Sequence, residues 1–180
     1  KDLGGVICQT DHKSQLACEH KILEDQAQSI WVYSFAYNNI EKNPHWLSFA
    51  RKTRDFMKKY MYAGDGKWHK KVSTTGGVIS YLCKDVVPPL FAAAGLVQLY
   101  KAGDNTKDLK LAKKTIYNAL KNYDHPDYKQ LICDKDFHFP LPVSGLRSQQ
   151  FSLVLVWILT QLLEFYHSRE LENIQNTHVY

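Results

Sequence analysis

The sequence predicts an all-α fold in which helical hairpins form a curved layer or a ring, with small β-hairpins in the connections. Three segments are apolar on nearly all sides, two segments are apolar on one side only, and the two kinds alternate along the chain. The pairing of an apolar and a one-sided segment at 26–60 recurs at 88–122, so that Ala50 and Ala112, for example, are separated by about 62 residues. A repeat of an inner and an outer helix is typical of stacked hairpins.

Length and composition favour one folded domain over residues 1–180. A chain of 180 residues with 44% hydrophobic and 13% aromatic side chains can bury a substantial core and is not typical of a disordered protein. No basic segment followed by a long apolar one marks a signal peptide at the start. The most apolar window, 151–165, is too short to cross a membrane and contains Thr160 and Gln161. We therefore expect a cytoplasmic protein with no membrane contact.

Three segments should form inner helices, because helices that are apolar nearly all round must be surrounded by protein. Their aromatic side chains, including Trp31 and Phe35, are interpreted as core residues rather than as a platform for stacking a sugar ring. The three segments are 29–38, 90–100 and 151–165.

Two outer helices are predicted at 43–60 and 106–123, where apolar residues recur at helical spacing on one face only. The first opens with Asn43 as an N-cap followed by Pro44 at the first helical position. Most of the excess positive charge, a net +5, lies on the polar faces of these two helices. No aromatic residues or glycines interleave with the basic ones, so we expect solvated faces and no nucleic-acid partner.

The connections between hairpins differ in kind. Glycines at 66 and at 76–77 flank turns around residues 67–69 and 78–80, which predict a small β-hairpin with Trp68 interpreted as a core residue. The segment 124–148 is long and proline-rich, and a connection of that length in a compact domain is often functional.

A substrate pocket is predicted where the ends of the inner helices meet these connections. Asp25 and Gln28 lie at the start of the first inner helix, Gln150 lies at the start of the third, and His138 lies in the connection just before it. If the inner helices converge, these four residues lie around one concave pocket.

The four cysteines, Cys8, Cys18, Cys83 and Cys133, form no Cys-x-x-Cys pair. Free thiols are therefore expected, and neither the cysteines nor any other ligand spacing predicts a metal site.

The chain resembles the N-acylglucosamine 2-epimerase family over roughly residues 4–165. The resemblance rests on several moderately specific motifs that occur in order rather than on one diagnostic signature. These motifs are GGVICQTDHKSQL at the start, the inner helix from Gln28 to Asn38, NPHWLSFARKTRDFM, DGKW at 65–68 and LFAAAGLVQLYKAGD at 90–104.

The resemblance implies an (α/α)6 barrel, of which three inner and two clear outer helices make about half. It also implies cofactor-independent epimerisation or aldose–ketose isomerisation of a mono- or disaccharide, in which a base removes the C2 proton of the ring-opened sugar to form an enediolate. The family typically has an arginine on the first inner helix, and alignment on Trp31 places Gln28 at that position. Nothing in the resemblance assigns a catalytic residue within this chain.

Two other functions remain open from the sequence. The first is a non-catalytic carbohydrate-binding or interaction module on the same scaffold, since Gln28 cannot supply charge to an enediolate. Such a half-ring would expose apolar flanks of its inner helices, so self-association or a partner chain is expected. The second is a glycoside hydrolase or lyase, which would require paired carboxylates facing the pocket. The adjacent Glu24 and Asp25 are interpreted instead as residues that complement the helix dipole.

Overall fold

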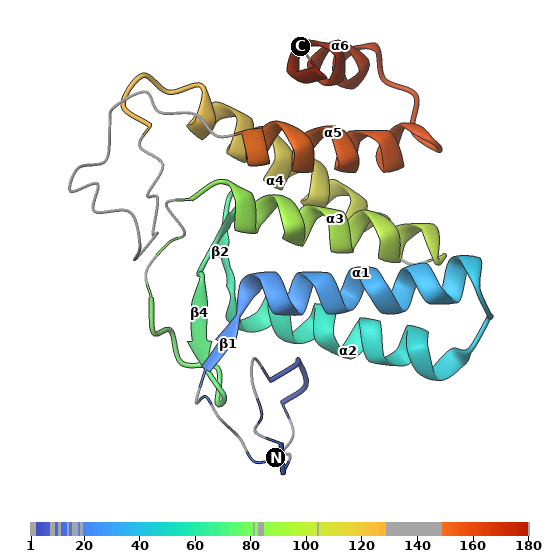
Figure 1. Ribbon diagram of the computed structural model, residues 1–180, viewed down its shortest axis with the longest axis vertical. Coiled ribbons are helices and arrows are strands. Elements are labelled where there is room, and N and C mark those ends of the chain that lie inside the picture. The colour runs from blue at the N-terminus through green and yellow to red at the C-terminus, as the bar shows by residue number, and fades with distance from the viewer. Residues whose placement is uncertain are drawn as a thin grey trace.

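The computed structural model describes residues 3–7, 10, 12–13, 15, 18, 20–80, 82, 85–103, 105–128 and 149–179. Its helices form three consecutive hairpins, α1–α2, α3–α4 and α5–α6 (Figure 1). The elements in chain order are β1 (His20–Ile22), α1 (Leu23–Asn39), α2 (Pro44–Tyr60), β2 (Tyr62–Gly64), β3 (Lys67–Trp68), β4 (Lys71–Ser73), α3 (Val87–Lys101), α4 (Thr106–Tyr123), α5 (Gln149–Leu163) and α6 (Arg169–Val179).

The predicted fold class is confirmed: the structure is a partial (α/α) toroid. Helices α1, α3 and α5 form one layer of parallel inner helices, and α2, α4 and α6 each run back antiparallel to the inner helix before them (Figure 1). The outer helix α6 was not predicted, because it is short and carries mostly polar side chains.

Helix α3 lies in the middle of the inner layer and carries the core. Twelve of its fifteen residues are buried, because α1 packs on one side of it, α5 on the other, and α4 behind it. A Cβ atom at Gly95 would lie 2.7 Å from the carbonyl oxygen of Ala27, so the glycine allows the backbones of α1 and α3 to approach closely.

The outer helices begin at residues that cap them. The side chain of Asn43 accepts a hydrogen bond from the backbone N–H of His45 at 3.0 Å, and Asn105 accepts one from Lys107 at 2.9 Å. The cap predicted at Asn43 is therefore confirmed, and α4 begins with the same kind of cap.

Two small antiparallel sheets lie at one end of the helical layer. The first pairs β2 with β3, so that Trp68 lies opposite Tyr62, and the second pairs β1 with β4. The predicted hairpin between 67–69 and 78–80 is therefore wrong for Trp68, which pairs with Tyr62. Val78 forms a bridge to Val72 of β4 instead. Trp68 is buried as predicted and donates from Nε1 to Oγ1 of Thr115 at 3.1 Å.

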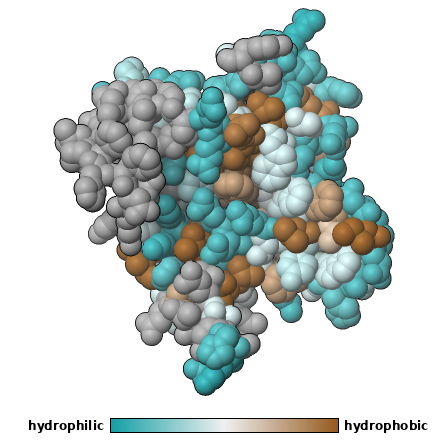
Figure 2. Space-filling model, in the orientation of Figure 1, coloured by the Kyte–Doolittle hydropathy of each residue, from teal (hydrophilic) through white to brown (hydrophobic). Residues whose placement is uncertain are grey.

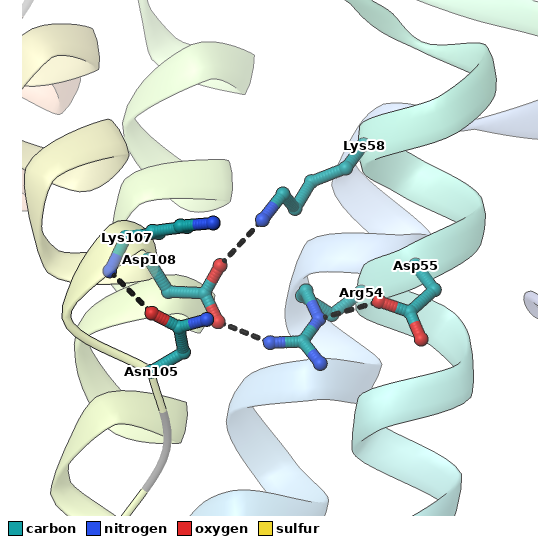
Figure 3. Close-up of polar contacts among 6 residues, drawn as sticks. All are labelled: Arg54, Asp55, Lys58, Asn105, Lys107 and Asp108. Atoms are coloured by element: carbon teal, nitrogen blue, oxygen red, sulfur yellow. Dashed lines mark hydrogen bonds and ion pairs between the residues drawn. The ribbon is translucent and has the colours of Figure 1, made fainter.

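A buried ion cluster joins the outer helices α2 and α4. The fully buried carboxylate of Asp108 accepts from Nζ of Lys58 at 2.9 Å and also from Nη1 of Arg54 (Figure 3). Arg54 also pairs with the exposed Asp55 on its own helix. Two cations around one buried carboxylate hold the first hairpin to the second, because removal of either partner leaves charge without compensation.

We expect Asp108→Asn to lower the free energy of unfolding by about 3 kcal/mol, because it leaves Arg54 and Lys58 facing a neutral side chain. The matched control is Asp55→Asn, which removes an exposed partner of the same arginine and should cost less than about 1 kcal/mol. Urea denaturation of the two variants at 25 °C measures both values, and equal losses would contradict this role for Asp108.

Candidate functional site at the starts of the inner helices

The three inner helices all begin at the end of the molecule that carries the two small sheets (Figure 1). Strand β1 leads directly into α1 and pairs with β4 from His20 opposite Ser73 to Ile22 opposite Lys71. The backbone N–H of Leu23 then donates to the carbonyl oxygen of Lys70 at 3.0 Å. Because helix N-termini carry partial positive charge, three parallel helices that start together favour a negative group at this end.

Charged side chains from three parts of the chain meet around Glu24. Burial raises the pKa of its carboxyl above 4.5, with Asp85 and Asp25 adding to the rise and Lys70 opposing it. Burial also raises the pKa of Asp25, which the nearby His20 opposes. Asp85 stands at the start of α3, where its carboxylate accepts from the backbone N–H of Val87 at 3.0 Å. The site therefore holds three neighbouring carboxyl groups at the starts of two inner helices.

Gln26 has a structural role at the same end. Its fully buried side chain accepts from the backbone N–H of Val6 at 2.7 Å and donates to the carbonyl oxygen of Val6 at 2.9 Å. Gly5 beside it has a φ of +78°, and a Cβ atom there would lie 2.6 Å from Oε1 of Gln26. Gln26 thus ties the start of the chain to α1 and is not available to a ligand.

The predicted site residues take different places. Asp25 is half-buried in the first turn of α1, and Gln28 is exposed one turn later on the same helix. Gln150 is exposed in the first turn of α5, at the same end of the layer but separated from α1 by α3 (Figure 1). His138 lies outside the described residues. The structure therefore brings Asp25 and Gln28 together and leaves Gln150 on the far side of α3.

Glu24 and Asp85 are the residues of this site that sequence reasoning missed. The sequence predicts only a dipole-complementing role for Glu24, and the position of Asp85 carries no motif. The signal that could have found Asp85 is its place two residues before Pro-containing helix α3, where a carboxylate commonly caps a helix.

A hydrogen bond and a contact between two tryptophan rings join α1 directly to α5. Nε1 of Trp31 donates to Oε1 of Gln161 at 2.8 Å, and the Trp31 and Trp157 rings lie 5.4 Å apart between centroids. Phe91 of α3 lies 6.3 Å from Trp157. Trp31 is partly buried against the core, which agrees with its predicted packing role.

A cavity of about 130 Å³ adjoins this end, between Trp68, Asp85, Pro89 and Asn118. Sugar-sized ligands usually occupy pockets of roughly 300–1,000 Å³. A larger hollow of about 400 Å³ lies against α2, where Lys52, Phe56 and Tyr60 line it. The smaller cavity lies between β3, the start of α3 and the outer helix α4, and the larger hollow lies between α2 and the start of the chain, so Asp25, Gln28 and Gln150 line neither of them.

Within the described ranges, no group of three or more His, Cys, Asp or Glu side chains could hold a metal ion. No helix found there is long and apolar enough to cross a bilayer. The free-thiol prediction is wrong for Cys18, which is disulfide-bonded. The other three cysteines lie outside the described residues.

The sequence model of the N-acylglucosamine 2-epimerase (GlcNAc 2-epimerase) family matches residues 4–158 of the chain. The chain belongs to this family. The match includes the starts of all three inner helices and ends within α5, before α6. No curated protein matches the sequence.

Solved structures of sugar enzymes share the fold of this family member. A sugar epimerase from a ruminal bacterium superposes with a TM-score of 0.82 at 15% identity, over 99% of this chain and 48% of that one. A cellobiose 2-epimerase from Bacillus thermoamylovorans B4167 gives 0.81 at 16% identity, over 99% and 48%. An unsaturated glucuronyl hydrolase from Bacillus sp. GL1 gives 0.68 at 13% identity, over 99% and 49%. The chain therefore spans about half the length of these proteins.

We expect Glu24→Gln to stabilise the fold more at pH 7 than at pH 4. A raised pKa means that the folded chain holds this proton more tightly than the unfolded chain does. The stability from this group is therefore present below its ordinary pKa of 4.5 and is lost as pH rises through the raised value. Glutamine has nearly the size and shape of glutamic acid and can still form hydrogen bonds, but its side chain cannot ionise.

Thermal melts of both proteins from pH 4 to pH 7 measure this effect as a difference in Tm that widens with pH. Glu172→Gln, at an exposed position on α6, serves as the control for the loss of a carboxylate away from the site. A gap for Glu24→Gln that stays constant or narrows as pH rises would contradict the assignment.

Proposed function

We propose that this chain forms the first half of the active site of a cofactor-independent sugar epimerase or aldose–ketose isomerase. The observation that carries the proposal is the family match across residues 4–158. The shared fold agrees with it, although the fold also occurs in a hydrolase, so the fold alone does not select the reaction. The substrate is a mono- or disaccharide with a free carbonyl in its open-chain form.

The geometry suits an enediolate intermediate. The reaction takes the C2 proton from a sugar beside its C1 aldehyde, and negative charge develops on the two oxygens before a proton returns to C2 or C1. The N-termini of α1, α3 and α5 lie at the same end and favour that charge through their dipoles (Figure 1), whereas the carboxyl groups of Glu24, Asp25 and Asp85 oppose it when they are ionised. The starts of the inner helices are therefore where we place the sugar.

Asp25 and Gln28 are proposed to hold sugar hydroxyls from one face of α1. A half-buried carboxylate and an exposed amide one turn apart can each hydrogen-bond a hydroxyl of the same sugar. Glu24 beside them has a raised pKa, which brings its carboxyl closer to the pH at which it can exchange a proton with substrate. His138 and Gln150 remain proposed substrate contacts from the third hairpin.

The direct test is exchange of the C2 proton in D2O. The folded chain is incubated with N-acetylmannosamine, mannose and cellobiose, and proton NMR follows loss of the C2 signal. We expect loss with at least one of the three sugars. If none exchanges while a sugar still raises the Tm, the chain is a carbohydrate-binding module and the catalytic proposal is wrong.

Two substitutions of Gln28 should change the rate of C2 proton exchange in opposite directions. We expect Gln28→Ala to slow exchange about 5-fold, because one neutral hydrogen bond contributes about 1 kcal/mol. Gln28→Arg should speed exchange, because a guanidinium adds positive charge beside the enediolate and is the residue that the family typically has there. Asn39→Ala, exposed at the opposite end of α1, is the matched control and should change nothing.

A cytoplasmic location stays a prediction, and the Cys18 disulfide argues against it, because disulfides persist in oxidising compartments.

A further inference from the structure

The exposed faces of the inner helices mix two kinds of side chain. Figure 2 shows hydrophobic side chains gathered over α5 and recurring along α1, with hydrophilic ones between them. On α1, for example, the polar Gln28 and the apolar Val32 are both exposed. The cavity of about 130 Å³ between β3, the start of α3 and α4 is different, because its apolar and polar residues lie at different depths.

The buried residues that line this cavity are all apolar, and Trp68, Pro89 and Ala119 are among them. The more exposed lining residues are mostly polar. Asp85 and Asn118 are half-buried, and Lys67 and Asn122 are exposed. The cavity therefore has an apolar floor and a rim that carries two amides, a carboxylate and an ammonium group.

Hydrogen bonds and close packing hold the walls of the cavity in place. Nε1 of Trp68 donates to Oγ1 of Thr115 on α4 at 3.1 Å. The turn before Trp68 packs directly on α4, since a Cβ atom at Gly66 would lie 2.6 Å from the carbonyl oxygen of Lys114. Asp85 accepts from a backbone N–H in the first turn of α3 at 3.0 Å. The cavity is therefore preformed, and a ligand would spend little binding free energy on organising it.

The rim carries hydrogen-bonding groups that no other described residue satisfies. Asn118 and Asn122 are one turn apart on α4, and Oδ1 of Asn118 accepts from Nδ2 of Asn122 at 3.0 Å. Within the described ranges, Nδ2 of Asn118 and Oδ1 of Asn122 have no partner, and neither has the second oxygen of Asp85. A ligand would meet one amide donor and two acceptors here.

The charges at the rim favour a neutral ligand that carries several hydroxyl groups. Asp85 would repel an anion, and Lys67 would repel a cation. An apolar ligand would displace water from the amides and the carboxylate without replacing its hydrogen bonds. A hydroxyl group both donates and accepts, so neighbouring hydroxyls can pair with the amides and with Asp85 while their carbon atoms pack on the apolar floor.

The volume limits the part of the ligand that can enter. At roughly 30 Å³ for each water molecule, a cavity of about 130 Å³ holds about four of them. This is too small for a complete sugar, which needs a pocket of roughly 300 Å³ or more. A chain of about three or four hydroxyl-bearing carbons fits, either as a free polyol or as one edge of a sugar whose remainder stays outside.

We propose that this cavity is a binding site for a small polyol, free or as the edge of a sugar, separate from the place where the substrate reacts. Asp25, Gln28 and Gln150 do not line it, and the outer helix α4 forms one of its walls. Asp85 belongs both to the cavity and to the carboxyl groups around Glu24, so a bound polyol would lie next to the candidate site. This proposal concerns binding and does not depend on catalysis.

NMR titration of the 15N-labelled chain tests the proposal, with erythritol and methyl α-D-glucopyranoside as the probes. Erythritol is a free polyol. The glucoside is locked as a ring without a free carbonyl, so it cannot undergo C2 proton exchange and reports binding alone. We expect saturable shifts of the indole N–H signal of Trp68 and of the side-chain amide signals of Asn118 and Asn122 with at least one probe, with a dissociation constant of about 1–50 mM.

Asn118→Ala and Asn122→Ala should each raise the dissociation constant about 5-fold, because each removes one hydrogen bond to a neutral hydroxyl group. Both positions are at least partly exposed, so circular dichroism should show unchanged helix content. Asn176→Ala, which removes an exposed asparagine of α6, is the matched control and should leave the dissociation constant unchanged.

The two probes separate the two sources of the polyol. Saturation by erythritol alone supports a free polyol as the ligand, and saturation by the glucoside supports the edge of a sugar. No saturable shift with either probe would mean that the cavity holds only water and would overturn the proposal. Unchanged affinity in both asparagine variants would overturn it too, since the ligand would then lie elsewhere. A stronger response to inorganic sulfate than to either probe would contradict the choice of a neutral ligand.

Discussion

The packing of α3 between α1 and α5 is the constraint on which the rest of the structure depends. The absence of a side chain at Gly95 lets the backbone of α3 approach Ala27 of α1. Twelve of the fifteen residues of α3 are buried, and most of these are apolar. The outer helix of each hairpin runs antiparallel to its inner helix and returns the chain to the same end, so α1, α3 and α5 run parallel and begin together. The common start of the inner helices, and with it the candidate site, follows from this hairpin repeat.

Two carboxyl groups of this molecule differ in how deeply they are buried and in the charges around them. Asp108 is fully buried and is compensated by Arg54 and Lys58, so it contributes to holding the outer helices in register. Glu24 is partly buried, and this burial raises the pKa of its carboxyl most; Lys70 lowers that pKa, and Asp85 and Asp25 raise it further. A buried carboxylate that is paired with cations stabilises a fold. A carboxyl whose pKa is raised by burial and by neighbouring carboxyl groups is typical of a site that transfers protons.

The sequence predicted the helices better than it predicted the site. Asn43 and Pro44 marked the start of α2 correctly because capping is a local matter of a few backbone groups. The start of α1 at Leu23 agrees with the prediction that Glu24 and Asp25 lie at the helix start, because acidic side chains in a first turn are a local signal. For Glu24, local reasoning stopped at the helix dipole, since its neighbours Lys70 and Asp85 come from distant parts of the chain.

By itself, the sequence determined that this protein is built of inner and outer helices, and where its N-caps and its family motifs lie. These features depend on spacing and on local hydrogen bonds, which the order of residues specifies directly. Only the tertiary structure decided which apolar faces are covered and which carboxyl groups meet. Burial depends on how many neighbours a helix has, and for this reason α3 buries twelve of its fifteen residues, whereas α1 buries five of seventeen and α5 buries seven of fifteen.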